Sequence, residues 1–122
     1  MIAESFSDLE AARLLTLSCA DAIDTVGAQG ARDSIASIKY AVPKLTHAVI
    51  DRSLQVHGGA GVCSDFPLAE AYANIRTLRI ADGPDAVHKR TVAMVEVKRA
   101  RKRLEKEKLG GEDGGSKQKS RM

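Results

Sequence analysis

Two short segments hold the residue types that could carry out chemistry. Residues 55–61 read Gln-Val-His-Gly-Gly-Ala-Gly, so three glycines interrupt a long stretch with a helical pattern. Glycine lacks a Cβ, and it serves where a chain turns sharply or where an anion must touch backbone N–H groups. Residues 79–85 read Arg-Ile-Ala-Asp-Gly-Pro-Asp and place two carboxylates around a Gly-Pro pair. Such a carboxylate can cap the next helix or accept a proton from a substrate.

The histidines and cysteines do not form a recognisable site. His47, His57 and His88 show neither H-E-x-x-H spacing nor a Cys/His pairing pattern, so we expect no metal ion. His57 lies inside the glycine segment, where its ring is expected to pack. Cys19 and Cys63 lack C-x-x-C spacing, which is typical of two reduced, small hydrophobic residues in an intracellular protein.

Apolar residues recur every three or four positions, which predicts helices at about 2–26 and 31–56, a short helix ending near 77, and a last helix from about 84. The apolar stripes comprise Ile2, Phe6, Leu9, Leu15, Cys19, Ala22 and Val26, then Ile35, Ile38, Val42, Leu45 and Val49, then Leu68, Tyr72 and Ile75, and finally Val87, Thr91 and Met94. The chain is 43% hydrophobic but has two Phe, two Tyr and no Trp, which indicates an aliphatic, helical interior. The sequence therefore predicts an all-α domain over residues 1–108.

The formal net charge of +3 reflects a basic segment over residues 98–108. This segment could be a solvated helix end or a nucleic-acid contact. Glu105 and Glu107 interrupt it and no aromatic residues accompany it, so we favour the solvated helix and expect no nucleic acid. Residues 109–122 are rich in glycine and polar residues and are expected to form a flexible tail. No apolar run approaches eighteen residues, so no membrane span is predicted.

Together, residues 55–61 and 79–85 resemble two motifs of the C-terminal helical domain of acyl-CoA dehydrogenases. The resemblance extends from about Ile2 to about Glu96, and the motif sequences are most similar to those of family members ten and eleven. It implies an up-down helical bundle that lacks the family's first bundle helix, its N-terminal helical domain and its middle β-domain. These are flavin enzymes that oxidise acyl-CoA thioesters between Cα and Cβ. We therefore expect the C-terminal portion of such an enzyme, inactive by itself.

The resemblance also implies a role for each site residue. Asp82 would be the base, one methylene shorter than the family's usual Glu, and its backbone N–H would help to polarise the thioester oxygen. Gly83 would leave room for the acyl chain. In the family, a threonine at the position of Pro84 contacts the flavin. Pro84 has neither a hydroxyl nor an N–H, so this contact would be lost or would be made by the Asp85 backbone instead.

The glycine segment would contact the cofactor FAD in this family. Gln55, Gly58 and Gly59 would line its diphosphate, usually on the flavin of a neighbouring subunit. This implies a homo-oligomer, or assembly with a full-length relative. Kinship also leads us to expect that the glycine segment and the Asp82 segment share a cleft.

Other interpretations of the same residues stay open. The glycine segment could be only a tight turn between helices that needs several positive φ values, and Asp82 and Asp85 could only cap a helix. The chain could then be a non-catalytic helical interaction module. The last residues, Ser120-Arg121-Met122, resemble the Ser-Lys-Leu peroxisomal address, so we expect a peroxisomal or mitochondrial location.

Overall fold

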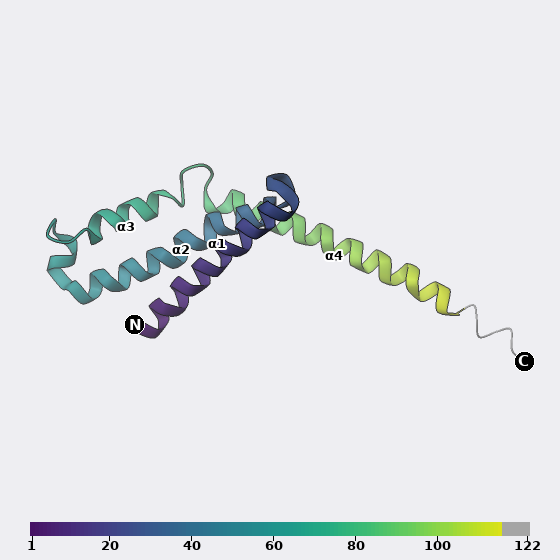
Figure 1. Ribbon diagram of the computed structural model, residues 1–122, viewed down its shortest axis with the longest axis horizontal. Coiled ribbons are helices and arrows are strands. Elements are labelled where there is room, and N and C mark those ends of the chain that lie inside the picture. The colour runs from purple at the N-terminus through teal and green to yellow at the C-terminus, as the bar shows by residue number, and fades with distance from the viewer. Residues whose placement is uncertain (116–122) are drawn as a thin grey trace, which may run out of the picture. The chain divides into compact units, whose positions relative to one another are not determined.

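A computed structural model describes the backbone of residues 1–115 and the side chains of residues 1–108. This part of the chain is helical and contains no strand, which confirms the predicted all-α class (Figure 1). The elements are α1 (Ile2–Gly30), α2 (Arg32–His57), the short 3₁₀ helix η1 (Gly58–Val62), α3 (Leu68–Thr77) and α4 (Asp85–Gly115). The flexible tail expected over 109–122, with Ser120-Arg121-Met122, lies outside the residues whose side chains are described.

The chain divides into two units. The first is Met1–Val92 and holds α1, α2, η1, α3 and the first two turns of α4, and the second begins at Ala93. Within the first unit α2 is the central helix, because α1, η1 and α3 all pack against it. None of the described helices is both long enough and apolar enough to cross a membrane.

A backbone break at Gly27 separates the straight part of α1 from the turn into α2. Gly27 has φ 74°, a left-handed conformation that glycine adopts without strain, and its carbonyl oxygen accepts a hydrogen bond from Ala31 N–H at 3.0 Å. This break lies one residue beyond the predicted end of the first helix. The chain then reverses, so that α2 lies beside α1 (Figure 1).

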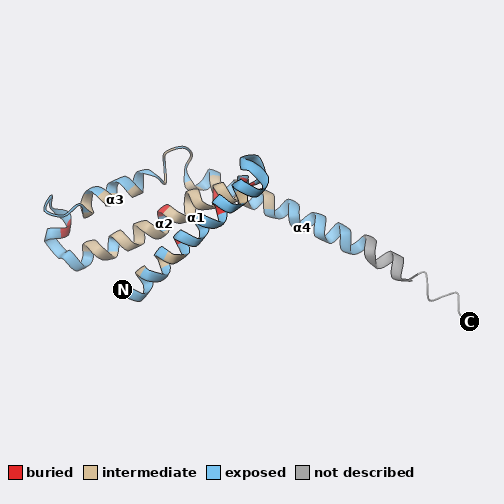
Figure 2. Cartoon of the chain, viewed as in Figure 1, coloured by how far each residue is buried: buried red, intermediate tan, exposed pale blue. Residues whose placement is uncertain are grey.

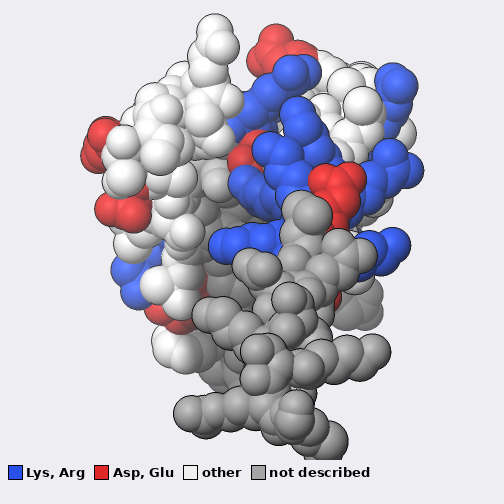
Figure 3. Space-filling view, turned by 90° about the vertical axis from the view of Figure 1, so that its right-hand side faces the viewer, with Lys and Arg blue, Asp and Glu red and all other residues white. Residues whose placement is uncertain are grey.

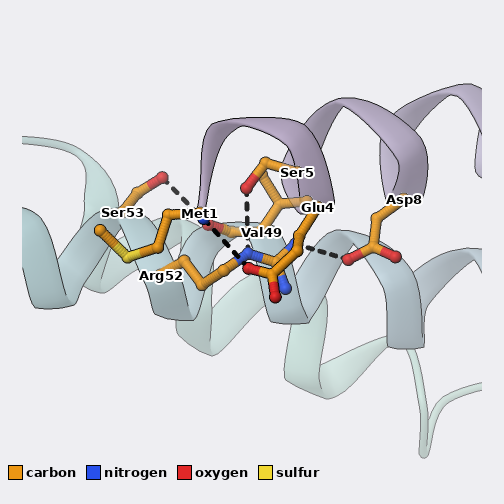
Figure 4. A network of polar contacts seen from close by, with 7 residues as sticks. All are labelled: Met1, Glu4, Ser5, Asp8, Val49, Arg52 and Ser53. Carbon is orange, nitrogen blue, oxygen red and sulfur yellow. Dashed lines mark hydrogen bonds and ion pairs between the residues drawn. The ribbon is translucent and has the colours of Figure 1, made fainter.

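Arg52 of α2 ties the two long helices together near the N-terminus (Figure 4). Its Nε donates to the hydroxyl oxygen of Ser5 at 2.9 Å, and its Nη2 pairs with the carboxylate of Asp8. Both charged side chains are about a quarter exposed, at 23% and 27%. The contact therefore combines a charge-assisted hydrogen bond with partial burial, which makes it stronger than an exposed ion pair.

The buried core of this part of the chain is small (Figure 2). Its apolar members are Ala12, Cys19, Ala31 and Ala36. The predicted stripes of α2 and α3 are half-buried, which agrees with prediction. Much of the α1 stripe is instead exposed, as are two residues of the α4 stripe. The exposed side chains are Ile2, Phe6, Leu9, Leu15, Val26, Val87 and Met94.

The pattern of the last helix predicts that Val87 and Met94 face inward, which is wrong for the chain by itself. The pattern of α1 predicts an amphipathic helix, and its apolar face is largely exposed. The physical reason for α1 is that it packs against α2 alone among the described helices. A helix with one neighbour buries a narrow strip of its surface and leaves the rest of a broad apolar face in water. In α1 that strip contains Ala12 and Cys19.

Candidate active site

The segment that carries Asp82 is a loop between α3 and α4, closed at its ends by Arg79 and Asp85. The backbone N–H of Asp85 donates to the carbonyl oxygen of Arg79 at 3.3 Å. The Arg79 guanidinium donates from Nε and Nη2 to Oδ2 of Asp85 at 2.9 and 2.7 Å. The two side chains are 27% and 16% exposed. Asp85 thus stabilises the loop, and its place in the first turn of α4 also suits the helix dipole.

Lys39 of α2 holds the same loop from the side. Its Nζ donates to the carbonyl oxygens of Leu78 and Ala81 at 2.6 and 2.7 Å. On the other side of Asp82, Nε2–H of His88 donates to the Asp82 carbonyl oxygen at 3.2 Å. The loop is therefore anchored both to α2 and to the first turns of α4.

Asp82 has an unusual backbone conformation. Its φ is 54°, the one positive value at a non-glycine residue in the described part of the chain, and Gly83 follows with φ 102°. Aspartate tolerates the left-handed region better than most residues, at a cost on the order of 1 kcal/mol. The carboxylate is exposed, and among the described residues neither it nor the Asp82 N–H has a hydrogen-bonding partner. Both groups are available to a ligand.

A cavity of about 520 Å³ lies beside Asp82. Most of its wall is apolar and comes from α2, with one leucine from the end of α3. The polar side chains in the wall come from α1, α2, the loop and α4. The lining residues are Thr16, Ile35, Ile38, Lys39, Val42, Pro43, Leu78, Asp82 and His88. An apolar cavity with a few convergent polar groups is typical of a small-molecule site.

The glycine segment forms the turn from α2 into η1. Gly58 has φ 57°, whereas the other two glycines do not have positive φ, so the suggested need for several positive values is wrong. A 3₁₀ turn has ordinary negative φ angles. The ring of His57 packs against Phe66 with centroids 5.0 Å apart, and its Nδ1–H donates to the carbonyl oxygen of Ser53 at 2.8 Å. His57 therefore packs locally, as predicted.

The other two glycines differ from each other. A Cβ at Gly61 would lie 3.0 Å from the carbonyl oxygen of Leu54 and 3.1 Å from Cβ of His57, so packing requires glycine there. A Cβ at Gly59 would meet nothing within 4 Å. Gly59, Gly58 and Gln55 are all exposed. The backbone of this turn is open to a group that approaches from outside the chain.

The structure does not bring the two segments together, and the described residues show no shared cleft between them. The glycine turn precedes α3 and the Asp82 loop follows it, so this helix of ten residues, about 15 Å long, lies between them (Figure 1). Asp82 lines the cavity of about 520 Å³, whereas Gln55, Gly58 and Gly59 are not among its lining residues. Asp82, Gly83, Pro84 and Asp85 do lie together in one loop.

Two residues that hold the loop, Lys39 and Arg79, were not singled out in the sequence. Lys39 had a detectable signal: it falls between Ile38 and Val42 on the apolar stripe of α2, four residues after Ile35. A charged residue at such a position needs polar partners, which the loop carbonyls supply. Arg79 had no comparable signal, because an arginine near a helix end is ordinary.

The remaining charged and metal-binding residue types add no second site. In the described residues, no group of three or more His, Cys, Asp or Glu side chains is placed to hold a metal ion. In the basic segment of α4, Glu96 pairs with Arg99 and lies 4.0 Å from Arg103. Figure 3 shows lysine and arginine side chains gathered on one face with acidic side chains between them.

Comparison with known proteins gives consistent matches. The family profile described as "Acyl-CoA dehydrogenase, C-terminal domain" matches residues 1–96. Acyl-CoA dehydrogenase family member 11 of Rattus norvegicus is 55% identical over 96 residues, which cover 79% of this chain and 12% of that protein. Family member 10 of Mus musculus is 48% identical over 97 residues, covering 80% and 9%.

A solved structure assigned as an acyl-CoA dehydrogenase from Mycobacterium abscessus superposes with a TM-score of 0.79 at 45% identity, covering 81% of this chain and 24% of that one. This match confirms the predicted helical-domain fold, and the relatives confirm the resemblance to members ten and eleven. The chain thus spans between 9 and 24% of the lengths of these three proteins.

Proposed function

The chain belongs to the acyl-CoA dehydrogenase family, and we propose that it works as the C-terminal helical domain of a flavin-dependent enzyme that oxidises acyl-CoA thioesters between Cα and Cβ. Asp82 is the base in this proposal. The chain covers a small part of its relatives, and it carries this activity only in assembly with the rest of such an enzyme. The observation that carries the proposal is the unpaired Asp82 carboxylate at the wall of an apolar cavity.

The cavity supports this role because it joins an apolar wall to a free carboxylate. Aliphatic side chains such as Ile35, Ile38 and Val42 would hold the acyl chain out of water. The carboxylate of Asp82 would then accept a proton from Cα, the carbon beside the thioester carbonyl. A base that is already ion-paired would first have to lose its partner, and Asp82 has none among the described residues.

The backbone around Asp82 suits the thioester oxygen. The free Asp82 N–H is a donor that could bind this oxygen as negative charge develops on it, and one such donor contributes on the order of 3 kcal/mol to a reaction. Glycine at position 83 keeps the loop packed against His88, because a Cβ there would lie 3.0 Å from Nε2 of His88. Asp82 therefore offers its side chain and its backbone to the same substrate.

FAD, when bound, would take the hydride from Cβ. Gln55, Gly58 and Gly59 would hold its diphosphate, and the open backbone at Gly59 fits a group that arrives from outside. Pro84 has no N–H to offer, and Asp85 N–H already donates to Arg79, so a flavin contact there would require that bond to open. Because the glycine turn lies away from Asp82, we propose that each contacts a different flavin in a homo-oligomer, or in an assembly with a full-length relative.

The proposal can be tested in a hybrid enzyme. Residues 1–96 of this chain would replace the matching residues of rat family member 11, and oxidation of a series of acyl-CoA thioesters would be measured. We expect Asp82→Asn to lower kcat by about 100-fold or more, since a general base contributes about 10²- to 10⁴-fold. Asp24→Asn, at an exposed aspartate of α1, is the matched control. A flavin-loaded hybrid that lacks activity, or that is indifferent to Asp82→Asn, would contradict the proposal.

A second candidate function is the non-catalytic interaction module. It is favoured by the exposed large apolar side chains of α1, of which Ile2 is 90% exposed and Phe6 67%. This module would bind a relative without supporting its activity, so an active hybrid that depends on Asp82 would exclude it. A peroxisomal or mitochondrial location is also a proposal, and it rests on the family and on Ser120-Arg121-Met122, outside the described residues.

A further inference from the structure

We propose that Lys39 is a positioning residue for the reaction. Its ammonium group, bonded to the carbonyl oxygen of Ala81, orients and polarises the peptide between Ala81 and Asp82, so that the Asp82 N–H is held ready to bind the thioester oxygen. This inference rests on the proposed function of Asp82 and assigns a role to a residue on another helix. In this inference Lys39 acts through the Ala81 carbonyl oxygen and not through a contact with the reacting atoms.

The first step of the argument is the strength of the Lys39 contacts. Its Nζ lies 2.6 Å from the carbonyl oxygen of Leu78 and 2.7 Å from that of Ala81. Both distances are short for a nitrogen donor, and hydrogen bonds from a charged donor are roughly twice as strong as neutral ones. Lys39 lies in the first third of α2, 42 residues before Ala81, so it fixes the loop to a long helix.

The second step is the geometry of the peptide group. The carbonyl oxygen of Ala81 and the N–H of Asp82 belong to the same planar unit. The bond is trans, since residues 1–115 contain no cis peptide, and in a trans peptide the C=O and N–H point in opposite directions. When Lys39 holds the oxygen on the α2 side, the N–H must therefore point away from the ammonium. Among the described residues nothing accepts a hydrogen bond from that N–H.

The third step is polarisation. Hydrogen bonds that share a peptide group strengthen one another by about 10–30% per bond in condensed phases. The ammonium group of Lys39, bonded to the oxygen of the Ala81–Asp82 peptide, draws electron density from the peptide nitrogen. This makes the N–H a better hydrogen-bond donor. A neutral side chain that only filled the same space would leave the Asp82 N–H a weaker hydrogen-bond donor with a less fixed direction.

The fourth step concerns the backbone angles of Asp82. Its φ and ψ are set by the two peptide planes that flank its Cα. Lys39 holds the plane before Asp82, and His88 holds the plane after it through the Asp82 carbonyl oxygen at 3.2 Å. Together these two contacts stabilise the positive φ of 54°. Loss of Lys39 would let the first plane rotate and would move both the N–H and the carboxylate.

The positioning itself is tested by NMR on the full ¹⁵N-labelled chain. In Lys39→Met, which keeps the aliphatic stem, we expect the Asp82 amide proton to move upfield and its heteronuclear NOE to fall. Lys39→Arg keeps the charge and should restore both signals. Lys44→Met, at an exposed lysine of the same helix, is the control and should leave residues 78–83 unchanged. An Asp82 amide that is indifferent to Lys39→Met would overturn the inference.

The catalytic consequence is tested in the hybrid enzyme with an acyl-CoA that it oxidises. We expect Lys39→Met to lower kcat about tenfold or more, with KM changed less than about threefold, because a donor to the developing charge acts mainly in the transition state. The infrared stretch of a ¹³C-labelled thioester carbonyl should move to higher frequency, since its hydrogen bond weakens. Lys39→Arg should recover most of kcat.

The outcomes separate this inference from the function on which it rests. A wild-type hybrid without activity would overturn the proposed function. An active, Asp82-dependent hybrid in which Lys39→Met keeps its kcat and its carbonyl frequency would overturn only the role of Lys39. A loss of activity in Lys39→Met that Lys39→Arg does not recover, with an unchanged carbonyl frequency, would indicate a merely structural lysine and would also overturn it.

Discussion

The three glycines at residues 58–61 occupy their positions for different physical reasons. Gly58 has a left-handed φ, and Gly61 is packed against the backbone of Leu54. Gly59 has neither a positive φ nor a neighbour that a Cβ would meet. The fold of this chain therefore accounts for two glycines and leaves the third without an internal reason. A contact from outside the chain, such as the proposed flavin diphosphate, would supply one.

Alanine substitutions should separate these reasons. Gly61→Ala is expected to lower the free energy of unfolding by about 1–3 kcal/mol, because the new methyl group would overlap backbone that cannot easily move. Gly59→Ala is expected to change it by less than about 0.5 kcal/mol, as an exposed site with room for a methyl group. Urea unfolding followed by circular dichroism measures both. Equal losses of stability at the two sites would contradict this account of the turn.

At the scale of elements, the loop between α3 and α4 depends on the pair of Arg79 and Asp85. One carboxylate oxygen of Asp85, Oδ1, is buried without a partner, and the other is bonded only to Arg79. We expect Arg79→Met to lower the free energy of unfolding by about 1–3 kcal/mol, because it leaves a half-buried carboxylate without its partner. The exposed pair of Arg13 and Glu10 is the matched control.

Thermal unfolding of Arg79→Met and Arg13→Met, side by side, provides the measurement. The Arg13 hydrogen bond lowers the pKa of Glu10, but both side chains are in water, so Arg13→Met should have little effect on stability. If Arg13→Met is as destabilising as Arg79→Met, the pair of Arg79 and Asp85 has no special role in the stability of the loop. The comparison also tests whether Asp85 stabilises the loop through its bond to Arg79.

Much of the element structure could be predicted from the sequence, since it depends on local patterns. The stripe of α2, from Ile35 to Val49, and the short stripe of α3 gave helices in the right places because a helical period is visible within each segment. The exposed stripe of α1 could not be foreseen in the same way. Periodicity shows which face of a helix is apolar, whereas burial depends on how many neighbours cover that face.

The candidate site was only partly predictable for a similar reason. Asp82 and its neighbours were found as a local motif. The position of Lys39 on the apolar stripe marks it as unusual, but it does not show that its partner lies 42 positions away. The separation of the two motifs could have been predicted. A short helix was expected between the glycine turn and the loop, and the ten residues that it has in the structure hold its two ends apart.

At the scale of the whole molecule, the first unit buries few large side chains and leaves an apolar stripe of α1 in water. Positions four, three and eight residues apart lie on one side of a helix, so these side chains form a strip, which Arg13 interrupts between Leu9 and Leu17. The strip consists of Ile2, Phe6, Leu9 and Leu17, which are between 48% and 90% exposed. Exposed apolar side chains that gather on one face of a helix often mark an association site.

The chain should therefore associate through α1, and a charge within the strip should prevent it. Phe6→Asp is expected to weaken self-association, or binding to a full-length relative, at least tenfold, which is about 1.4 kcal/mol. The stability of the monomer should stay the same, because Phe6 is 67% exposed in it. Ser7→Asp places the same charge one residue away, off the strip, and is the control. Analytical ultracentrifugation over a concentration series measures both variants. If the wild-type chain stays monomeric throughout, association through α1 is refuted. If Phe6→Asp unfolds the chain, Phe6 contributes to the fold of the monomer and the variant does not report on association.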